Sequence, residues 1–151
     1  AQFLFFHYRF SGCCNRSRSS ARKSAPRWPS ETRWSAARLA VATGKSRRGL
    51  DDVLAMVPLK GLFDATRTAD ETASKPDPLM LNELMAELGV APARTLMIGD
   101  TTHDLQMAMR AGVASVGVSY GAHEHAAFDD FAPLFIAHST RELHDWLESN
   151  G

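Results

Sequence analysis

The sequence predicts an α/β domain built on a mainly parallel sheet with helices on both faces. From about Arg38 to the C-terminus, short apolar runs alternate with helix-length amphipathic segments. This alternation is typical of parallel sheets whose strands are joined by crossover helices. In addition, polar residues follow three of the strands, at Thr43, at Lys75 and at Asp100. Because the carboxyl ends of parallel strands share one edge of the sheet, where ligand sites form, these residues are expected to converge.

The first 35 residues differ in composition from the rest. Residues 1–34 carry seven Lys or Arg and one acid, whereas the remainder carries ten basic and sixteen acidic residues. The apolar run 3–6 suits a buried strand, but residues 11–35 are rich in Ser and Arg without any period. A flexible basic arm, a targeting extension and out-of-frame sequence are all open. We favour the third, because there is no initiator Met and a regular pattern begins abruptly near Arg38. We therefore divide the chain into a basic, irregular segment 1–35 and a domain 36–151.

A strand and a helix open this domain. Residues 39–42 form an apolar run that ends at Thr43. Ser46 is a good N-cap, because its hydroxyl can accept a bond from a backbone N–H of the first turn. The apolar residues that follow at helical spacing predict a helix to about Val57. Residues 62–66 predict a short second strand or extended piece.

The next helix, strand and helix surround the most polar strand end. Pro78 suits the first turn of a helix, and Gly89 suits its C-terminus. The apolar run 95–98 predicts a buried strand that ends just before Asp100, and Asp104 falls in the first turn of the following helix. A carboxylate at that position is stabilised by the partial positive charge of the helix N-terminus.

Two short strands and one helix complete the chain. The strands are expected at 114–118 and 134–137, and Ser139 with Glu142 has the spacing of a capping box. Trp146 lies on the expected inner face of this last helix. Five methionines are expected in the core because they fall on apolar faces. These are Met56, Met85, Met97, Met107 and Met109.

Asp100 and Asp104 form a pair of carboxylates at the carboxyl end of one strand. Two carboxylates brought together repel each other, and a hard cation such as Mg²⁺ relieves that repulsion. Ordinary turn and capping chemistry explains the same two residues without a metal. Spacing alone leaves both interpretations open.

Three segments together resemble a known family. Residues 39–43, 74–76 and 98–104 resemble motifs two, three and four of the haloacid dehalogenase (HAD) superfamily, in the right order and at sensible distances. The flanking residues look like the phosphoglycolate phosphatase branch; they are 111–113, 117–118 and 120–121. The resemblance covers about 38–151 and implies a three-layer Rossmann-like core.

The resemblance implies a role for each matched residue. Thr43 would hydrogen-bond a phosphoryl oxygen, with the Gly44 amide near it. Lys75 would neutralise the phosphoryl group. Asp100 would bind Mg²⁺, and Asp104 would bind it directly or through water. The plainer alternatives are that Thr43 simply ends a strand and that Lys75 is a solvated loop charge.

The family's first motif, Asp-x-Asp-Gly-Thr after a strand, is absent from this sequence. In the family its first Asp attacks phosphorus and its second is the general acid and base, but here no acid precedes Glu31. The run 3–6 is the one candidate to fill the central place of the motif-one strand in the sheet, and 11–35 is too short for the family's helical cap. We therefore expect an N-terminally truncated core without a cap domain.

The expected function follows from that truncation. By resemblance it is Mg²⁺-dependent hydrolysis of a small, phosphoglycolate-like phosphomonoester, with residues 1–151 inactive because the nucleophile is missing. A non-catalytic module that binds a phosphate or a partner is the alternative. The expected partner is therefore a small phosphorylated metabolite, and the sequence predicts no oligomeric state.

Other sites and compartments are disfavoured by specific absences. A nucleotide-binding loop at 44–46 would need a Gly where Leu39 stands. A transition-metal site at His103, His123 and His125 lacks a clear further ligand. The basic segment contains no nucleic-acid-binding motif, and no apolar run approaches the ~18 residues of a membrane span. The adjacent Cys13 and Cys14 form no disulfide framework, so we expect a cytoplasmic protein.

Overall fold

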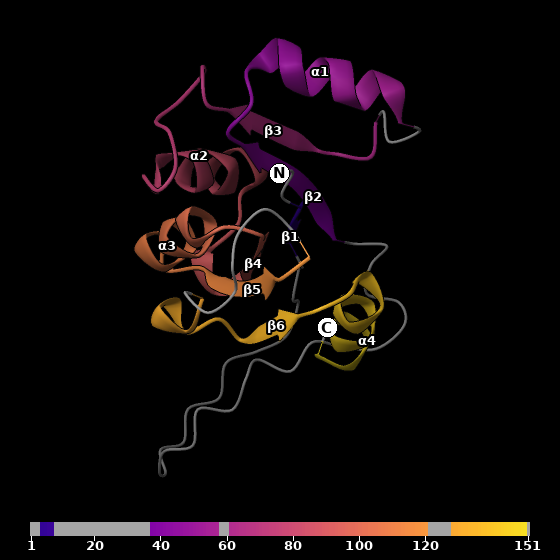
Figure 1. Cartoon of the computed structure of the whole chain (residues 1–151). Helices are drawn as coiled ribbons and strands as arrows, with labels where there is room; N and C mark the ends of the chain where they lie inside the picture. Colours follow the sequence, from indigo (N-terminus) through magenta and orange to yellow (C-terminus); the bar gives the residue numbers. More distant parts are fainter. Residues whose placement is uncertain (1–3, 8–36, 58–60, 121–127, 151) are drawn as a thin grey trace.

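A computed structural model describes residues 4–7, 37–57, 61–120 and 128–150. Within these residues the chain forms one sheet with the strand order β3-β2-β1-β4-β5-β6 (Figure 1). The strands are β1 (Leu4–His7), β2 (Arg38–Thr43), β3 (Ala65–Thr68), β4 (Thr95–Gly99), β5 (Ala114–Val118) and β6 (Phe135–Ala137). The helices are α1 (Arg47–Met56), α2 (Leu79–Leu88), α3 (Thr102–Arg110) and α4 (Thr140–Asn150), with short 3₁₀ turns at Pro92–Arg94 and Asp129–Phe131. The predicted α/β class with a mainly parallel sheet is confirmed.

The central strand β1 runs against its two neighbours. It pairs antiparallel with β2 on one side and with β4 on the other, whereas β2–β3, β4–β5 and β5–β6 are parallel. Its backbone groups thereby pair with strands that would otherwise face an interior gap, and unpaired interior groups are costly. The reversed direction has a second consequence. His7 pairs with Arg38 and Thr95, at the edge opposite to Thr43 and Gly99.

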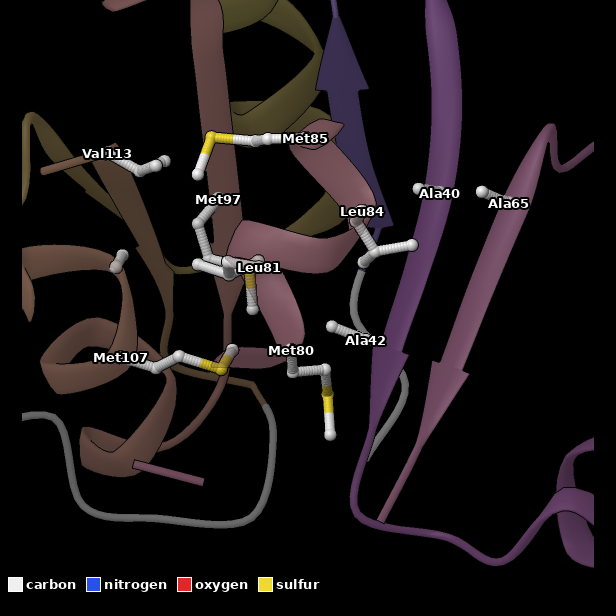
Figure 2. Packing of buried hydrophobic residues seen from close by; sticks show 11 residues of the cluster. Ala40, Ala42, Ala65, Met80, Leu81, Leu84, Met85, Met97, Met107 and Val113 are labelled. Atoms are coloured by element: carbon white, nitrogen blue, oxygen red, sulfur yellow. The ribbon is translucent and has the colours of Figure 1, made fainter. Parts of the chain in front are cut away.

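One face of the sheet is covered by α2 and α3. The four apolar residues Met80, Leu81, Leu84 and Met85 of α2 are buried and lie over β2 and β4 (Figure 2). Met97 and Met107 belong to the same cluster, as expected from the sequence. The opposite face is covered by α4, whose Leu143, Trp146 and Leu147 pack on β4, β5 and β6. Trp146 stacks on Phe135 with ring centroids 5.8 Å apart. These layers make the three-layer arrangement that the sequence predicted.

Two of the five expected core methionines are exposed. Met56 is 84% exposed and Met109 is 53% exposed. A helix turns by roughly 100° per residue, so Met109 projects about 200° away from the buried Met107. Met56 is the last residue of α1, about 240° around that helix from its buried Leu50. Placing these methionines in the core was therefore wrong.

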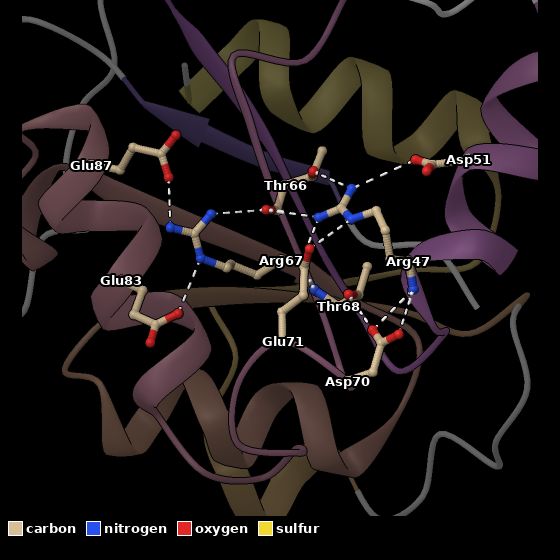
Figure 3. Close-up of polar contacts among 9 residues, drawn as sticks. All are labelled: Arg47, Asp51, Thr66, Arg67, Thr68, Asp70, Glu71, Glu83 and Glu87. Atoms are coloured by element: carbon tan, nitrogen blue, oxygen red, sulfur yellow. Dashed lines mark hydrogen bonds and ion pairs between the residues drawn. The ribbon is translucent and has the colours of Figure 1, made fainter.

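The loop between β3 and α2 is tied to the start of α1. The Arg47 guanidinium donates from Nε to Glu71 Oε1 at 2.8 Å and from Nη1 to Thr66 Oγ1 at 2.8 Å (Figure 3). The backbone N–H of Arg47 donates to Asp70 Oδ1 at 2.9 Å. Hydrogen bonding to Arg47 lowers the pKa of Glu71 to about 2. These contacts fix the loop four residues before Lys75 and so help to position that lysine.

Strand β3 begins later than expected. The run 62–66 was predicted to be extended, but β3 spans Ala65–Thr68. Asp64 ends the preceding turn, because its carboxylate accepts from Arg38 Nη1 at 2.6 Å and from the backbone N–H of Leu39 at 2.9 Å. The acceptor role of Asp64 pins β3 to the start of β2.

Candidate functional site

Loops that follow β2, β3 and β4 meet around a cavity at the carboxyl edge of the sheet. The cavity has a volume of about 440 Å³. The polar side chains among its lining residues are those of Lys45, Ser74, Lys75, Thr101 and His103. The convergence of strand ends expected from the sequence is therefore present, and it joins residues up to 59 positions apart, Gly44 and His103.

Lys75 and Asp104 form a buried ion pair beside this cavity. The Lys75 ammonium donates to Asp104 Oδ1 at 2.6 Å and to the backbone oxygen of Ala42 at 2.9 Å. The side chains are 9% and 0% exposed, respectively. Burial lowers the pKa of Lys75 below its ordinary value, while the charges of Asp104 and Asp100 act in the opposite direction. The lysine is thus a positioned residue and not a solvated loop charge.

The start of α3 holds the other oxygen of Asp104. Asp104 Oδ2 accepts from the Thr101 hydroxyl at 2.6 Å and from the Thr101 backbone N–H at 3.0 Å. Thr101 Oγ1 in turn accepts from the Asp104 backbone N–H at 3.3 Å, which completes a capping box. Both carboxylate oxygens of Asp104 are therefore already hydrogen-bonded.

Gly99 is required by the same arrangement. A Cβ added at Gly99 would lie 2.4 Å from Asp104 Cβ and 3.1 Å from its Cγ. Real Cβ atoms do not approach so closely, so only glycine allows Asp104 to pack against the end of β4. Sequence reasoning missed this role of Gly99 and the cap at Thr101. The Thr-x-x-Asp spacing of 101–104 was the available signal for the cap.

Thr43 ends β2 beside the cavity, and Gly44 follows it. Gly44 lines the cavity, whereas Thr43 is fully buried. Thr43 Oγ1 accepts from the backbone N–H of Lys45 at 3.2 Å. Through this hydrogen bond the Thr43 hydroxyl holds the backbone of the loop that contains Gly44 and Lys45.

Asp100 and Asp104 would supply few protein ligands to a divalent metal. Asp100 directly follows β4 and is 8% exposed. Its hard oxygens suit Mg²⁺, which is often held by one or two carboxylates together with substrate phosphate and waters. Asp104 fits through a water, since its oxygens already accept hydrogen bonds. Within 4–7, 37–57, 61–120 and 128–150, three or more His, Cys, Asp or Glu are nowhere close enough to hold a metal. A Mg²⁺ ion held by Asp100 would therefore need substrate phosphate and waters to complete its ligands.

The central strand brings no carboxylate to this site. Its residues are Leu4-Phe-Phe-His7, and His7 lies at the far edge of the sheet. In sequence, residues 1–3 before it are Ala, Gln and Phe. The expected central filler is thus found, but its antiparallel direction leads the chain away from the cavity.

Comparison with known proteins agrees with this geometry. The family described as haloacid dehalogenase-like hydrolase matches residues 31–118. The chain belongs to the haloacid dehalogenase-like hydrolases. The resemblance drawn from the three motifs is confirmed, and curated relatives place the chain with the phosphoglycolate phosphatase type of this family.

Three curated relatives match this chain over part of their own length. The Probable phosphatase IndB of Dickeya dadantii (strain 3937) is 45% identical over 70% of this chain and 46% of its own length. The Phosphoglycolate phosphatase of Vibrio vulnificus (strain YJ016) is 33% identical over 71% of this chain and 47% of its own. That of Escherichia coli (strain K12) is 32% identical over 70% and 42%. The chain spans about half the length of these relatives.

Solved structures show the same fold. A haloacid dehalogenase-like family hydrolase from Streptococcus pneumoniae has a TM-score of 0.67 at 22% identity and covers 75% of this chain and 53% of its own. A HAD family hydrolase from Deinococcus radiodurans R1, solved with bound phosphate and sodium, has a TM-score of 0.64 at 21% identity, covering 70% and 49%. Across the described part of our chain, no helix is both long and apolar enough to span a membrane.

Proposed function

We propose that this chain carries the phosphate-binding part of a Mg²⁺-dependent HAD phosphatase that acts on a small phosphomonoester of the phosphoglycolate class. We further propose that residues 1–151 by themselves bind such an ester without hydrolysing it. The observation that supports this proposal is the buried Lys75–Asp104 pair beside a cavity lined by Lys45 and His103. The proposed lack of hydrolysis is supported by the central strand β1, which contributes no carboxylate.

Each residue has a defined part in this proposal. Gly44 offers its backbone amide, and Lys75 offers positive charge to the phosphoryl oxygens. Asp104 holds the Lys75 ammonium at the end of β2 by the contacts described above. Asp100 would hold Mg²⁺ directly, and Asp104 would hold it through a water. When bound, the metal would withdraw charge from the phosphoryl oxygens. Neutralising that charge and fixing the group in place is most of what a protein supplies in phosphoryl transfer.

The proposed lack of hydrolysis follows from the missing carboxylates. The covalent route of the family needs one aspartate to attack phosphorus and another to transfer the proton. Within residues 1–151 no Asp or Glu precedes Glu31, and the end of β1 points to the wrong edge. The Lys75 ammonium and the Asp104 carboxylate are held together as a buried ion pair, so neither is proposed as a substitute nucleophile or base.

The partner and the compartment belong to the same proposal. A small phosphorylated metabolite fits the size and charge of the cavity. The adjacent Cys13 and Cys14 accord with a reducing compartment such as the cytoplasm.

The test is a paired measurement on purified residues 1–151. Phosphate release from phosphoglycolate in Mg²⁺ is expected to equal the buffer blank, while calorimetry detects binding of the intact ester. The control is Asp100→Ala, which identifies contaminating phosphatases because their activity does not depend on this residue. Turnover that disappears in Asp100→Ala would contradict the proposed inactivity. Absence of binding would contradict the proposed phosphate site.

A further inference from the structure

Lys45 and Lys75 both line the cavity, but their charges are compensated differently. The Lys75 ammonium is held by the buried Asp104 carboxylate at 2.6 Å. Over the described ranges, the Lys45 ammonium has no carboxylate within ion-pair distance. Of the two lysines that line the cavity, Lys45 is therefore the one whose charge no carboxylate of the described residues compensates.

The backbone of Lys45 is fixed on both sides. Its N–H donates to Thr43 Oγ1 at 3.2 Å, and its carbonyl oxygen accepts from the backbone N–H of Ala69 at 3.1 Å. The first contact anchors Lys45 to the end of β2, and the second anchors it to the loop after β3. The position of its Cα at the cavity wall thus depends on backbone contacts that a substitution of the side chain leaves in place.

The cavity has polar lining residues beyond the proposed phosphate position. The proposed phosphate position at Gly44 and Lys75 takes one part of its lining. The side chains of Lys45, Ser74 and His103 line the remainder, and His103 is the second residue of α3. A ligand with a single anionic group at Lys75 would leave the Lys45 charge without a partner.

We propose that Lys45 is a specificity residue that binds a second anionic group, a carboxylate, of a small phosphorylated acid. This inference rests on the proposed function, since the phosphate of the same ligand lies at Gly44 and Lys75. A charge-assisted hydrogen bond between an ammonium and a carboxylate is among the stronger polar contacts in proteins. The ligand class is therefore a phosphate ester of a short hydroxy acid, and phosphoglycolate is its smallest member.

The experiment compares two ligands that differ only in the second charge. Phosphoglycolate carries a carboxylate, whereas ethyl phosphate carries a methyl group at that position. Binding of each to residues 1–151 is measured by calorimetry at constant ionic strength. Wild-type protein is expected to bind phosphoglycolate roughly ten-fold more tightly than ethyl phosphate, the factor expected of one hydrogen bond to a charged group.

Three variants test whether Lys45 causes this preference. Lys45→Ala is expected to bring the affinity ratio close to one, with a much smaller loss of affinity for ethyl phosphate than for phosphoglycolate. Lys45→Arg is expected to keep most of the preference. Arg48→Ala is the matched control, because Arg48 is an exposed cation three positions further along that does not line the cavity. This variant is expected to keep the full ratio.

The outcomes separate this inference from the proposed function. Equal weakening of both ligands by Lys45→Ala would show that Lys45 contacts the phosphate and would overturn the inference. A ratio of one in the wild-type protein would also overturn it, although phosphate binding would still stand. Failure of both ligands to bind the wild-type protein would overturn the proposed function and the inference together.

Discussion

Replacing Lys75 by methionine removes the ammonium that faces the buried Asp104 carboxylate. Methionine keeps much of the volume, so the main change is the loss of the counter-charge. Removing one member of a buried ion pair typically costs about 3–5 kcal/mol of folding stability. The two hydrogen bonds from Thr101 remain on Asp104 Oδ2, and they place the expected loss near the lower end, at about 3 kcal/mol.

The assay is urea unfolding monitored by circular dichroism. With a denaturant slope of about 2 kcal/mol per molar, the expected loss lowers the midpoint by about 1.5 M. Asp104→Asn should cost a similar amount, because it leaves the Lys75 ammonium buried with the Ala42 carbonyl oxygen. The double variant should lose at least about 1.5 kcal/mol less than the sum of the two single losses, since coupled neighbours are not additive.

The control is Arg67→Met, which breaks a more exposed pairing with Glu83 and Glu87. Surface ion pairs contribute roughly 0–1 kcal/mol, so this variant should stay within about 1 kcal/mol of the wild-type protein. Losses below that size for Lys75→Met and Asp104→Asn, or additive losses in the double variant, would refute the structural role assigned to the pair.

Three further predictions concern the glycine contact, acid stability and the metal. Gly99→Ala should destabilise the fold by roughly 1–3 kcal/mol in urea unfolding, because the added Cβ would lie 2.4 Å from Asp104 Cβ. Gly44→Ala is the control, because a Cβ added there has no atom within 4 Å, and its unfolding free energy should stay within about 0.5 kcal/mol of the wild-type value. The pKa of Glu71 is lowered from 4.5 to about 2, so the stability that Glu71 contributes is present above pH 4.5 and is lost as the pH falls toward 2. Glu71→Gln should therefore flatten the curve of unfolding free energy against pH in this range. An unchanged curve would count against the contact with Arg47. Mg²⁺ alone should raise the melting temperature little. Mg²⁺ with phosphate should raise it more than phosphate alone, because binding to the folded state stabilises it. A Mg²⁺-dependent rise in the presence of phosphate that survives Asp100→Asn would exclude Asp100 as the ligand.

The parts of the fold that depend on local pattern could be read from the sequence. Ser46 caps α1 by accepting from the Gly49 backbone N–H, and Gly89 ends α2 with a positive φ of 67°. The convergence of Lys75 with the Asp100 strand end also followed, because parallel strands place their carboxyl ends on one edge. These features need only spacing, capping chemistry and the rule that governs parallel strands.

The parts that depend on tertiary partners could not be predicted in the same way. An apolar run identifies 3–6 as a strand, but side chains alternate in the same way in both directions, so the pattern does not specify the antiparallel pairing of β1. The hydrogen bonds from Lys75 and Thr101 to the two carboxylate oxygens of Asp104 could not be predicted, because they depend on distances between side chains. The exposure of Met56 likewise depends on which side of α1 faces the rest of the protein, and that side is defined by the buried Leu50.

Phosphorus NMR of phosphoglycolate mixed with residues 1–151 and Mg²⁺ tests the central claim most directly, since one spectrum reports both binding and hydrolysis. The ester signal is expected to shift or broaden as the protein is added, with no inorganic phosphate signal growing over hours. An ester signal that does not respond to the protein would contradict the proposed phosphate site. Growth of inorganic phosphate that Asp100→Ala abolishes would contradict the proposal that this chain binds the ester without cleaving it.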